Sequence, residues 1–146
     1  EKFDLPLMVK GVVVAEDAKR CVEAGVDVVY VSNHGGRQLN AAPTTIESLK
    51  VIRQAVGADM PLIFDGGIRS GEHVIKALAS GANFAMVGRS AMYGLGAGGG
   101  SGLADILDVI SNEASSVMGL IGHKSVVDVG SANLASTHNA EASGRR

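Results

Sequence analysis

The sequence predicts an α/β fold in which a parallel sheet is covered by helices. Short apolar runs that suit buried strands alternate four times with stretches of helical periodicity. A polar cluster follows each apolar run, and a glycine stands where each of the first three helices would end. With 146 residues, 46% of them hydrophobic and 19% charged, the chain is long enough for one globular domain and too short for two ordinary ones.

The first half of the chain predicts two strands and the helix between them. Residues 5–9 form a short apolar run that ends before Lys10. Residues 16–24 mix apolar and charged side chains at helical spacing, and Gly25 follows in the place of a helix-terminating residue. Residues 26–31 predict the second strand, and residues 28–31 are continuously apolar rather than alternating, which indicates a strand buried on both faces.

Two more strand–helix units follow. Thr44 and Glu47 have the spacing of a capping box, and an apolar helical face then extends to residue 56. Residues 61–64 predict the third strand. Ser70 is positioned to cap a third helix, which Gly81 would end, and residues 83–87 predict the fourth strand.

The C-terminal part is predicted to hold one long helix and a disordered tail. Residues 93–102 are rich in glycine and indicate a flexible connection, followed by a helix over 103–120. Residues 94–99 match G-x-G-x-x-G literally, but they do not follow a strand directly, so a dinucleotide-binding role is rejected. From Gly130 onward no periodicity remains, which divides the chain into a folded region, 1–129, and a disordered tail, 130–146.

Composition excludes several kinds of protein. A net charge of −2 and an aromatic content of 3% argue against a nucleic acid or an anionic membrane as partner. No apolar run approaches a membrane span, no Cys/His cluster has metal-ligand spacing, and G-x-S-x-G is absent. The single Cys21 excludes an intrachain disulfide and fits a reducing compartment. No leader opens the chain, and a first residue of Glu1 suggests a processed chain or a fragment.

His34 and Arg37 are the strongest candidates for chemistry, because they directly follow the second strand. Parallel α/β folds bind ligands at the carboxyl ends of their strands. Histidine transfers protons near neutral pH, and arginine binds a carboxylate through two parallel hydrogen bonds. The alternatives are a histidine that only fixes a turn and an arginine in a surface ion pair. The other histidines lack such neighbours and are expected on a helix surface, in a loop and in the tail: His73, His123 and His138.

Three further polar clusters follow the remaining strands. Glycine backbone N–H groups, two arginines and the start of the helix near Ser70 favour a phosphate. A carboxylate in that cluster would accept hydrogen bonds from sugar-like hydroxyls. Lys10 adds a cation at the same edge, although alone it would be taken for a solvated lysine. The candidate phosphate-binding cluster is Asp65, Gly66, Gly67, Ile68 and Arg69, with Gly88 and Arg89.

Four motifs together identify a resemblance. VKG at 9–11, SNHGGRQL at 32–39, DGGIRSG at 65–71 and VGR at 87–89 resemble, in order and spacing, the C-terminal half of FMN-dependent α-hydroxy-acid dehydrogenases and oxidases. This is the family of glycolate oxidase, lactate oxidase and mandelate dehydrogenase. The resemblance covers about residues 5–128. It implies a TIM (β/α)₈ barrel, of which this chain supplies about four units as a C-terminal half-barrel.

The resemblance also implies residue roles. His34 would be the base and, with Arg37, would bind the substrate, whose carboxylate Arg37 holds. Lys10 would lie near N1 and O2 of the flavin, and Ser32 would touch the flavin. Asp65 would hold the ribityl chain beside a phosphate site. The cofactor-binding set it implies is Lys10, Ser32, Asp65, Gly66, Gly67, Ile68, Arg69, Gly88 and Arg89.

Two positions depart from the family pattern, and the family's other half is not represented. Asn40 stands where an aspartate is usual, and Ser70 where a basic residue is frequent. The resemblance implies that four strands, substrate-contacting tyrosines and an arginine, and the aspartate that orients the histidine belong to the N-terminal half. We therefore expect an incomplete site and a half-barrel with two exposed sheet edges.

The expected function is FMN-dependent oxidation of a small L-2-hydroxy acid to the 2-keto acid. One alternative is an FMN- or phosphate-binding half-barrel without turnover. Another FMN barrel, such as an isomerase, is disfavoured by the pairing of His34 with Arg37. The resemblance further implies a homo-oligomer in the full-length parent and a cytoplasmic location, peroxisomal or membrane-peripheral in some relatives. The motifs leave open which hydroxy acid is used and whether oxygen, quinone or cytochrome accepts the electrons.

Overall fold

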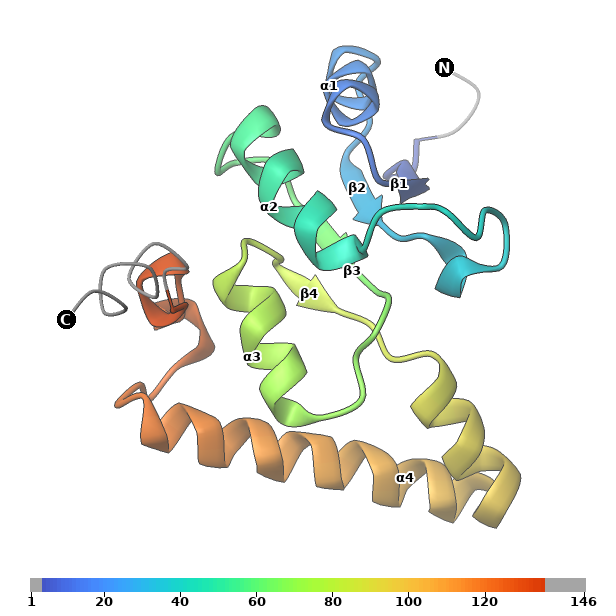
Figure 1. The fold of residues 1–146 in the computed structure, drawn as a ribbon, viewed down its shortest axis with the longest axis vertical. Coiled ribbons are helices and arrows are strands. Elements are labelled where there is room, and N and C mark those ends of the chain that lie inside the picture. Colours follow the sequence, from blue (N-terminus) through green and yellow to red (C-terminus); the bar gives the residue numbers. More distant parts are fainter. Residues whose placement is uncertain (1–3, 136–146) are drawn as a thin grey trace, which may run out of the picture.

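The computed structural model, which describes residues 4–135, contains one parallel sheet with helices on one side (Figure 1). The strands lie in the order β1-β2-β3-β4, and each neighbouring pair is parallel. Figure 1 shows helices α1 (Ala15–Glu23), α2 (Thr45–Val56) and α3 (Gly71–Ala79) on one face of the sheet. The α/β prediction is confirmed. The strands are β1 (Met8–Val12), β2 (Val28–Val31), β3 (Leu62–Phe64) and β4 (Phe84–Ala85).

The two faces of the sheet differ in burial. Side chains alternate between faces along a strand, and those facing the helices form the core. Val29, Val31, Leu62 and Phe64 are almost completely buried there. The other face carries a row of residues in register across the four strands. That row is Lys10, Tyr30, Ile63 and Phe84, and the side chain of Phe84 is 59% exposed.

Three helices match the sequence prediction closely. They are α1 (Ala15–Glu23), α2 (Thr45–Val56) and α3 (Gly71–Ala79). The Ser70 hydroxyl accepts a hydrogen bond from the His73 N–H, as expected for a capping residue. The predicted capping box of α2 is not formed, because the Thr44 hydroxyl donates to the Glu47 carboxylate and makes no cap hydrogen bond to the backbone.

The first strand is shifted from its predicted position. Residues 5–9 suggested a strand ending before Lys10, whereas β1 runs from Met8 to Val12. Leu5 and Leu7 are exposed. The strand continues because β2 pairs with it as far as Val12, across a bulge at Gly11, whose φ of 100° suits glycine. Lys10 therefore lies within the strand and not in a following loop.

The glycine-rich segment predicted as a flexible connection is helical. Helix α4 spans Arg89–Leu120 and breaks only at Gly98 and Gly99, where the backbone leaves helical geometry. The two arms fold back on each other, and a Cβ at Gly94 or Gly102 would run into the backbone of the other residue. The prediction is wrong here because close packing of the two arms compensates the low helix propensity of glycine.

Short helical turns extend the ordered chain beyond Gly130, where the sequence indicated disorder. After η2 (Val126–Asp128), residues Ser131–Asn133 form η3. The Asn133 side chain fixes this turn by accepting from the Gly130 N–H at 3.0 Å and lying 2.9 Å from Nε2 of His123. The rest of the predicted tail from residue 136, including His138, lies outside the described residues. No described helix is long and apolar enough to cross a membrane.

Candidate active site

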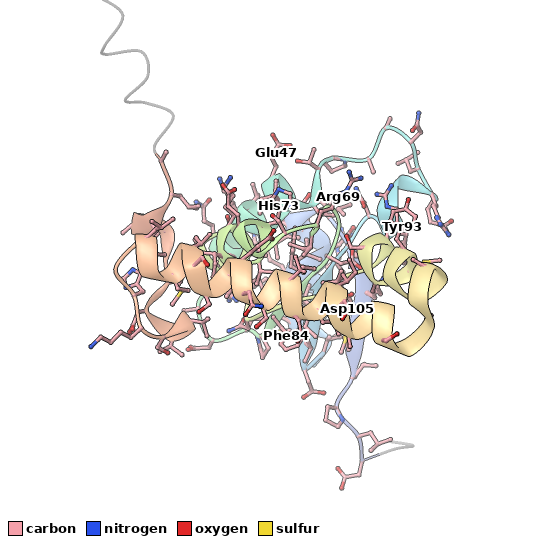
Figure 2. The ribbon with its side chains drawn as sticks, turned by 90° about the horizontal axis from the view of Figure 1, so that it is seen from below. Glu47, Arg69, His73, Phe84, Tyr93 and Asp105 are labelled. Atoms are coloured by element: carbon pink, nitrogen blue, oxygen red, sulfur yellow. The ribbon has the colours of Figure 1, made fainter. Side chains whose placement is uncertain are left out.

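The predicted polar clusters converge on one cavity of about 370 Å³ at the carboxyl ends of the strands, a size within the usual range of small-molecule sites. Parallel pairing explains this, because every strand ends at the same edge. In Figure 2 Arg69, which follows β3, lies on the opposite side of the molecule from Phe84, which begins β4. The lining residues are Lys10, His34, Gly35, Arg37, Gln38, Asp65, Gly66, Gly67, Ile68, Arg69, Met86, Gly88, Arg89 and Met92.

His34 is held in an unusual backbone conformation. It begins η1 (His34–Gly36) with a φ of 54°, the only positive φ of a non-glycine residue in the described chain. Its N–H donates to the Ser32 hydroxyl at 3.1 Å, and the Gly35 N–H donates to Asn33 Oδ1 at 3.1 Å. Such conformations cost about 1–3 kcal/mol and persist where the surroundings enforce them. These bonds therefore set the direction in which the imidazole leaves the backbone.

Ser32 lies beneath the cavity and not in its wall. It is the one predicted site residue absent from the lining, and its side chain is fully buried. Its hydroxyl oxygen accepts the His34 N–H. In this structure the Ser32 hydroxyl therefore holds the backbone of His34, and the cofactor contact that the family resemblance implied for Ser32 stays a prediction.

Asp65 joins two residues of neighbouring strands. Its Oδ2 lies 3.1 Å from the Lys10 ammonium and accepts a hydrogen bond from the Tyr30 hydroxyl at 2.9 Å. The ammonium also lies 4.7 Å from the centre of the Tyr30 ring, within the range of a cation–π contact. Burial raises the pKa of Tyr30 well above its ordinary value, and the hydrogen bond to Asp65 and its negative charge raise it further.

The other oxygen of Asp65 has no partner. Oδ1 is shielded from solvent and makes no hydrogen bond to any described residue, although buried polar atoms in proteins are nearly always paired. Asp65 lines the cavity. A hydroxyl-bearing ligand on this wall meets the 19% of the Asp65 side chain that is exposed, so the carboxylate fits the polyol chain of FMN as an acceptor.

The phosphate-binding cluster is built from two loops and one helix start. Gly66 and Gly67 have φ values of 99° and 97°, and the Thr45 hydroxyl donates to the Gly66 carbonyl at 3.0 Å. Arg69 and Arg89 add two guanidinium groups to the cavity wall. These donors and charges fit a phosphate group.

The starts of two helices, α3 and α4, lie near this cluster and differ in their free N–H groups. The N-terminus of α3 is partly occupied, because the Gly71 N–H donates to the Glu113 carboxylate at 2.8 Å. One N–H of this helix start is thus already paired, and the prediction that the start of α3 favours an anion stays a prediction. Gly88, which lines the cavity, is the N-cap of α4 and carries no side-chain cap. A helix N-terminus favours negative charge, so the start of α4 is a second candidate beside that of α3.

Sequence reasoning missed several residues of the site. Gln38 lines the cavity, and its place in the same motif as His34 could have indicated this. Tyr30 and Met86 belong to predicted strands without assigned chemistry, and Met92 lies outside the predicted elements. His73 was expected only on a helix surface, yet its Nδ1 accepts the Arg69 N–H at 3.3 Å. Among the described residues no group of three or more acidic, histidine or cysteine side chains could hold a metal ion.

Comparison with known proteins agrees with the motifs. Residues 1–136 match the family model described as FMN-dependent dehydrogenase. The chain belongs to this family. An L-lactate oxidase of Lactobacillus jensenii is 46% identical over 134 residues, which are 92% of this chain and 33% of that protein. A peroxisomal (S)-2-hydroxyacid oxidase of Arabidopsis thaliana is 45% identical over 126 residues, 86% of this chain and 35% of that protein.

The family also includes a differently named protein. A pre-mycofactocin synthase of Mycolicibacterium smegmatis is 43% identical over 129 residues, covering 88% of this chain and 32% of its own length. Similar identity to proteins of different names means that membership alone does not fix the substrate. The chain spans about a third of the length of the curated relatives it matches.

Solved structures confirm the fold. A Pediococcus acidilactici protein described as a lactate oxidase superposes with a TM-score of 0.84 at 46% identity, covering 86% of this chain and 35% of that one. A mandelate oxidase variant described with an FMN adduct has a TM-score of 0.84 at 45% identity, covering 87% and 40%. The fold is a partial TIM barrel, and FMN is the cofactor that the family assignment indicates.

Proposed function

We propose that this chain forms the FMN-binding, proton-transferring and carboxylate-binding part of a 2-hydroxy-acid oxidase or dehydrogenase, which converts a small L-2-hydroxy acid to the 2-keto acid. One observation carries the proposal: His34 and Arg37 share a single cavity with Asp65, Arg69 and Arg89. The first pair suits a small hydroxy acid, and the second group suits a polyol phosphate. A site with both halves matches an FMN-dependent reaction on a carboxylate substrate.

The residues divide the work by their chemistry. Arg37 binds the substrate carboxylate through its planar fork and fixes the orientation of the α-carbon. His34 accepts a proton as the hydroxyl-bearing carbon becomes a carbonyl. Bound FMN supplies the acceptor for the two electrons that the hydroxy acid loses. Arg69, Arg89 and the start of α4 hold the phosphate away from the reacting atoms.

The remaining residues of the cofactor site also have roles that follow from their chemistry. Asp65 accepts hydrogen bonds from the ribityl hydroxyls, and Gly66, Gly67 and Ile68 form the wall beside the phosphate. Gly88 is the N-cap of α4 in the same wall. Lys10, paired with Asp65 at 3.1 Å, brings a positive charge to the ring end of the cavity.

An anaerobic mixing experiment tests this function. The FMN-loaded protein is mixed with L-lactate, glycolate or (S)-mandelate, and the visible absorbance of oxidised flavin is followed. Bleaching by at least one acid supports the proposal. His34→Gln should abolish the bleaching and leave FMN bound. Unchanged bleaching in that variant would refute the role of His34 as the base.

A binding half-barrel without turnover is the second candidate. Two observations favour it. The inner face of the sheet, which is the face away from the helices, is open, and Met8, Phe84 and Met86 are 47%, 59% and 40% exposed. The chain also spans only about a third of the length of its relatives. FMN binding without bleaching by any hydroxy acid would support this candidate over the first.

Assembly and location are part of the same proposal. We infer a homo-oligomer for the full-length parent, as the resemblance to the family implies. We infer a cytoplasmic location, supported by the free and half-buried Cys21, which is typical of reducing compartments. Light scattering of the purified protein and fluorescence microscopy of a tagged copy test these two inferences.

A further inference from the structure

Tyr30 is a buried ionisable residue to which neither the motifs nor the proposed reaction gives a role. Its side chain is 7% exposed and lies on the inner face of β2, in register with Lys10 of β1 and Ile63 of β3. A buried tyrosine hydroxyl normally requires a hydrogen-bond partner. Its partner here is a residue that lines the cavity.

The contacts of Tyr30 divide between its hydroxyl and its ring. The hydroxyl donates its only proton to Asp65 Oδ2 at 2.9 Å. The ring face lies 4.7 Å from the Lys10 ammonium, which binds the same oxygen at 3.1 Å. Two donors therefore hold one oxygen of Asp65 from the side of the sheet, while Oδ1 has no partner among the described residues.

We propose that Tyr30 is a positioning residue of the FMN site, whose hydroxyl orients Asp65 to accept hydrogen bonds from the ribityl chain. This inference rests on the proposed function. Because the phenol donates to Asp65, the carboxylate stays an acceptor and cannot turn away from the cavity without leaving a buried hydroxyl unpaired, which is costly. The ligand contact is made by Asp65, and Tyr30 acts only through it.

Removal of a single oxygen atom from the Tyr30 side chain tests this role. Tyr30→Phe keeps the ring that Lys10 contacts and removes the hydroxyl that holds Asp65. The matched control is Tyr93→Phe, because the Tyr93 side chain is 71% exposed and does not line the cavity. Dissociation constants of both variants are measured by flavin titration for FMN, riboflavin and lumiflavin, which lacks the ribityl chain.

The expected pattern is specific to the ribityl contact. Tyr30→Phe should weaken FMN and riboflavin by the same factor, about 5- to 10-fold, as for one hydrogen bond of ordinary strength, and leave lumiflavin unchanged. Tyr93→Phe should change none of the three. An unchanged affinity for FMN, or an equal loss for lumiflavin, would overturn the inference.

A double-mutant cycle gives a second, independent measurement. In an Asp65→Asn background, adding Tyr30→Phe should produce little further loss of FMN or riboflavin affinity, because the contact it positions has already been changed. Additive losses would overturn the inference even if lumiflavin binds too weakly to measure. If the wild-type chain does not bind FMN, the proposed function fails as well; if only the Tyr30 pattern is absent, the proposed function stands.

Discussion

Gly11 of β1 and His34 of the loop after β2 lie in direct contact: a Cβ added to Gly11 would come 2.7 Å from Nε2 of the imidazole. Gly11 is also the bulged residue of β1. The bulge therefore brings a strand backbone against the ring of the proposed base. Because Gly11 has no side chain, the space beside it is free for the imidazole ring of His34.

Gly11→Ala is expected to displace the imidazole without removing it. A misplacement of about 1 Å can cost about 100-fold in rate, so flavin reduction by a hydroxy acid should slow by that order while FMN affinity stays unchanged. Rapid-mixing absorbance measures the first quantity and flavin titration the second.

The control for this variant separates backbone strain from contact. Gly25 also has a positive φ, 77°, but a Cβ there would meet no atom within 4 Å. Gly25→Ala should lower the free energy of unfolding and leave the reduction rate unchanged. If both variants slow the reaction equally, the Gly11–His34 contact is not the reason.

Arg89→Met is expected to weaken binding of FMN but not of riboflavin. Arg89 begins α4 beside the uncapped Gly88, where a phosphate gains both from the guanidinium and from the helix N-terminus. A lost charge-assisted contact should raise the Kd for FMN by about 10-fold or more. Titrations of both flavins measure this, with Arg20→Met on exposed α1 as the control.

The convergence of the polar clusters could be predicted because it follows from topology. Parallel strands place their carboxyl ends at one edge, so His34 and Arg69 had to approach once four βα units were identified. The features that the sequence did not predict depend on contacts between residues that are far apart along the chain. The α4 arms meet through Gly94 and Gly102, and Glu113 occupies the start of α3 from 42 residues away.

Arg53 illustrates the same limit. Arg53 lies in α2, and its local sequence assigns it no structural role. In the structure it donates to the Gly57, Met60 and Gly81 carbonyls and to Asn83 Oδ1. These bonds join the end of α2 to the segments before β3 and β4. Local pattern cannot reveal such a residue, since all but one of its acceptors are backbone oxygens, which every residue type carries.

Glu113→Gln is expected to destabilise the fold with little effect on flavin binding. The Glu113 carboxylate accepts the Gly71 N–H at 2.8 Å at the start of α3, where a negative charge is favourable. Loss of a helix cap costs about 0.5–2 kcal/mol. Urea unfolding should show this decrease, and Glu23→Gln at the C-terminal end of α1 should not. A large loss of FMN affinity in Glu113→Gln would show that α3 takes part in the anion site.

The raised pKa of Tyr30 predicts a loss of stability at alkaline pH. Burial and the contact with Asp65 make the folded state hold the phenol proton more tightly than the unfolded chain does, so the folded pKa lies well above the ordinary value of 10.0. The stabilisation is complete below the ordinary pKa and is lost as pH rises toward the folded pKa, because only the unfolded state then gains from ionisation. Urea unfolding of Tyr30→Phe should show a smaller decrease in stability above pH 10 than the wild type. In Tyr93→Phe, where Tyr30 is the one remaining tyrosine, phenolate absorbance should appear only as the protein unfolds, and its appearance in the folded protein near pH 10 would contradict the burial of this hydroxyl.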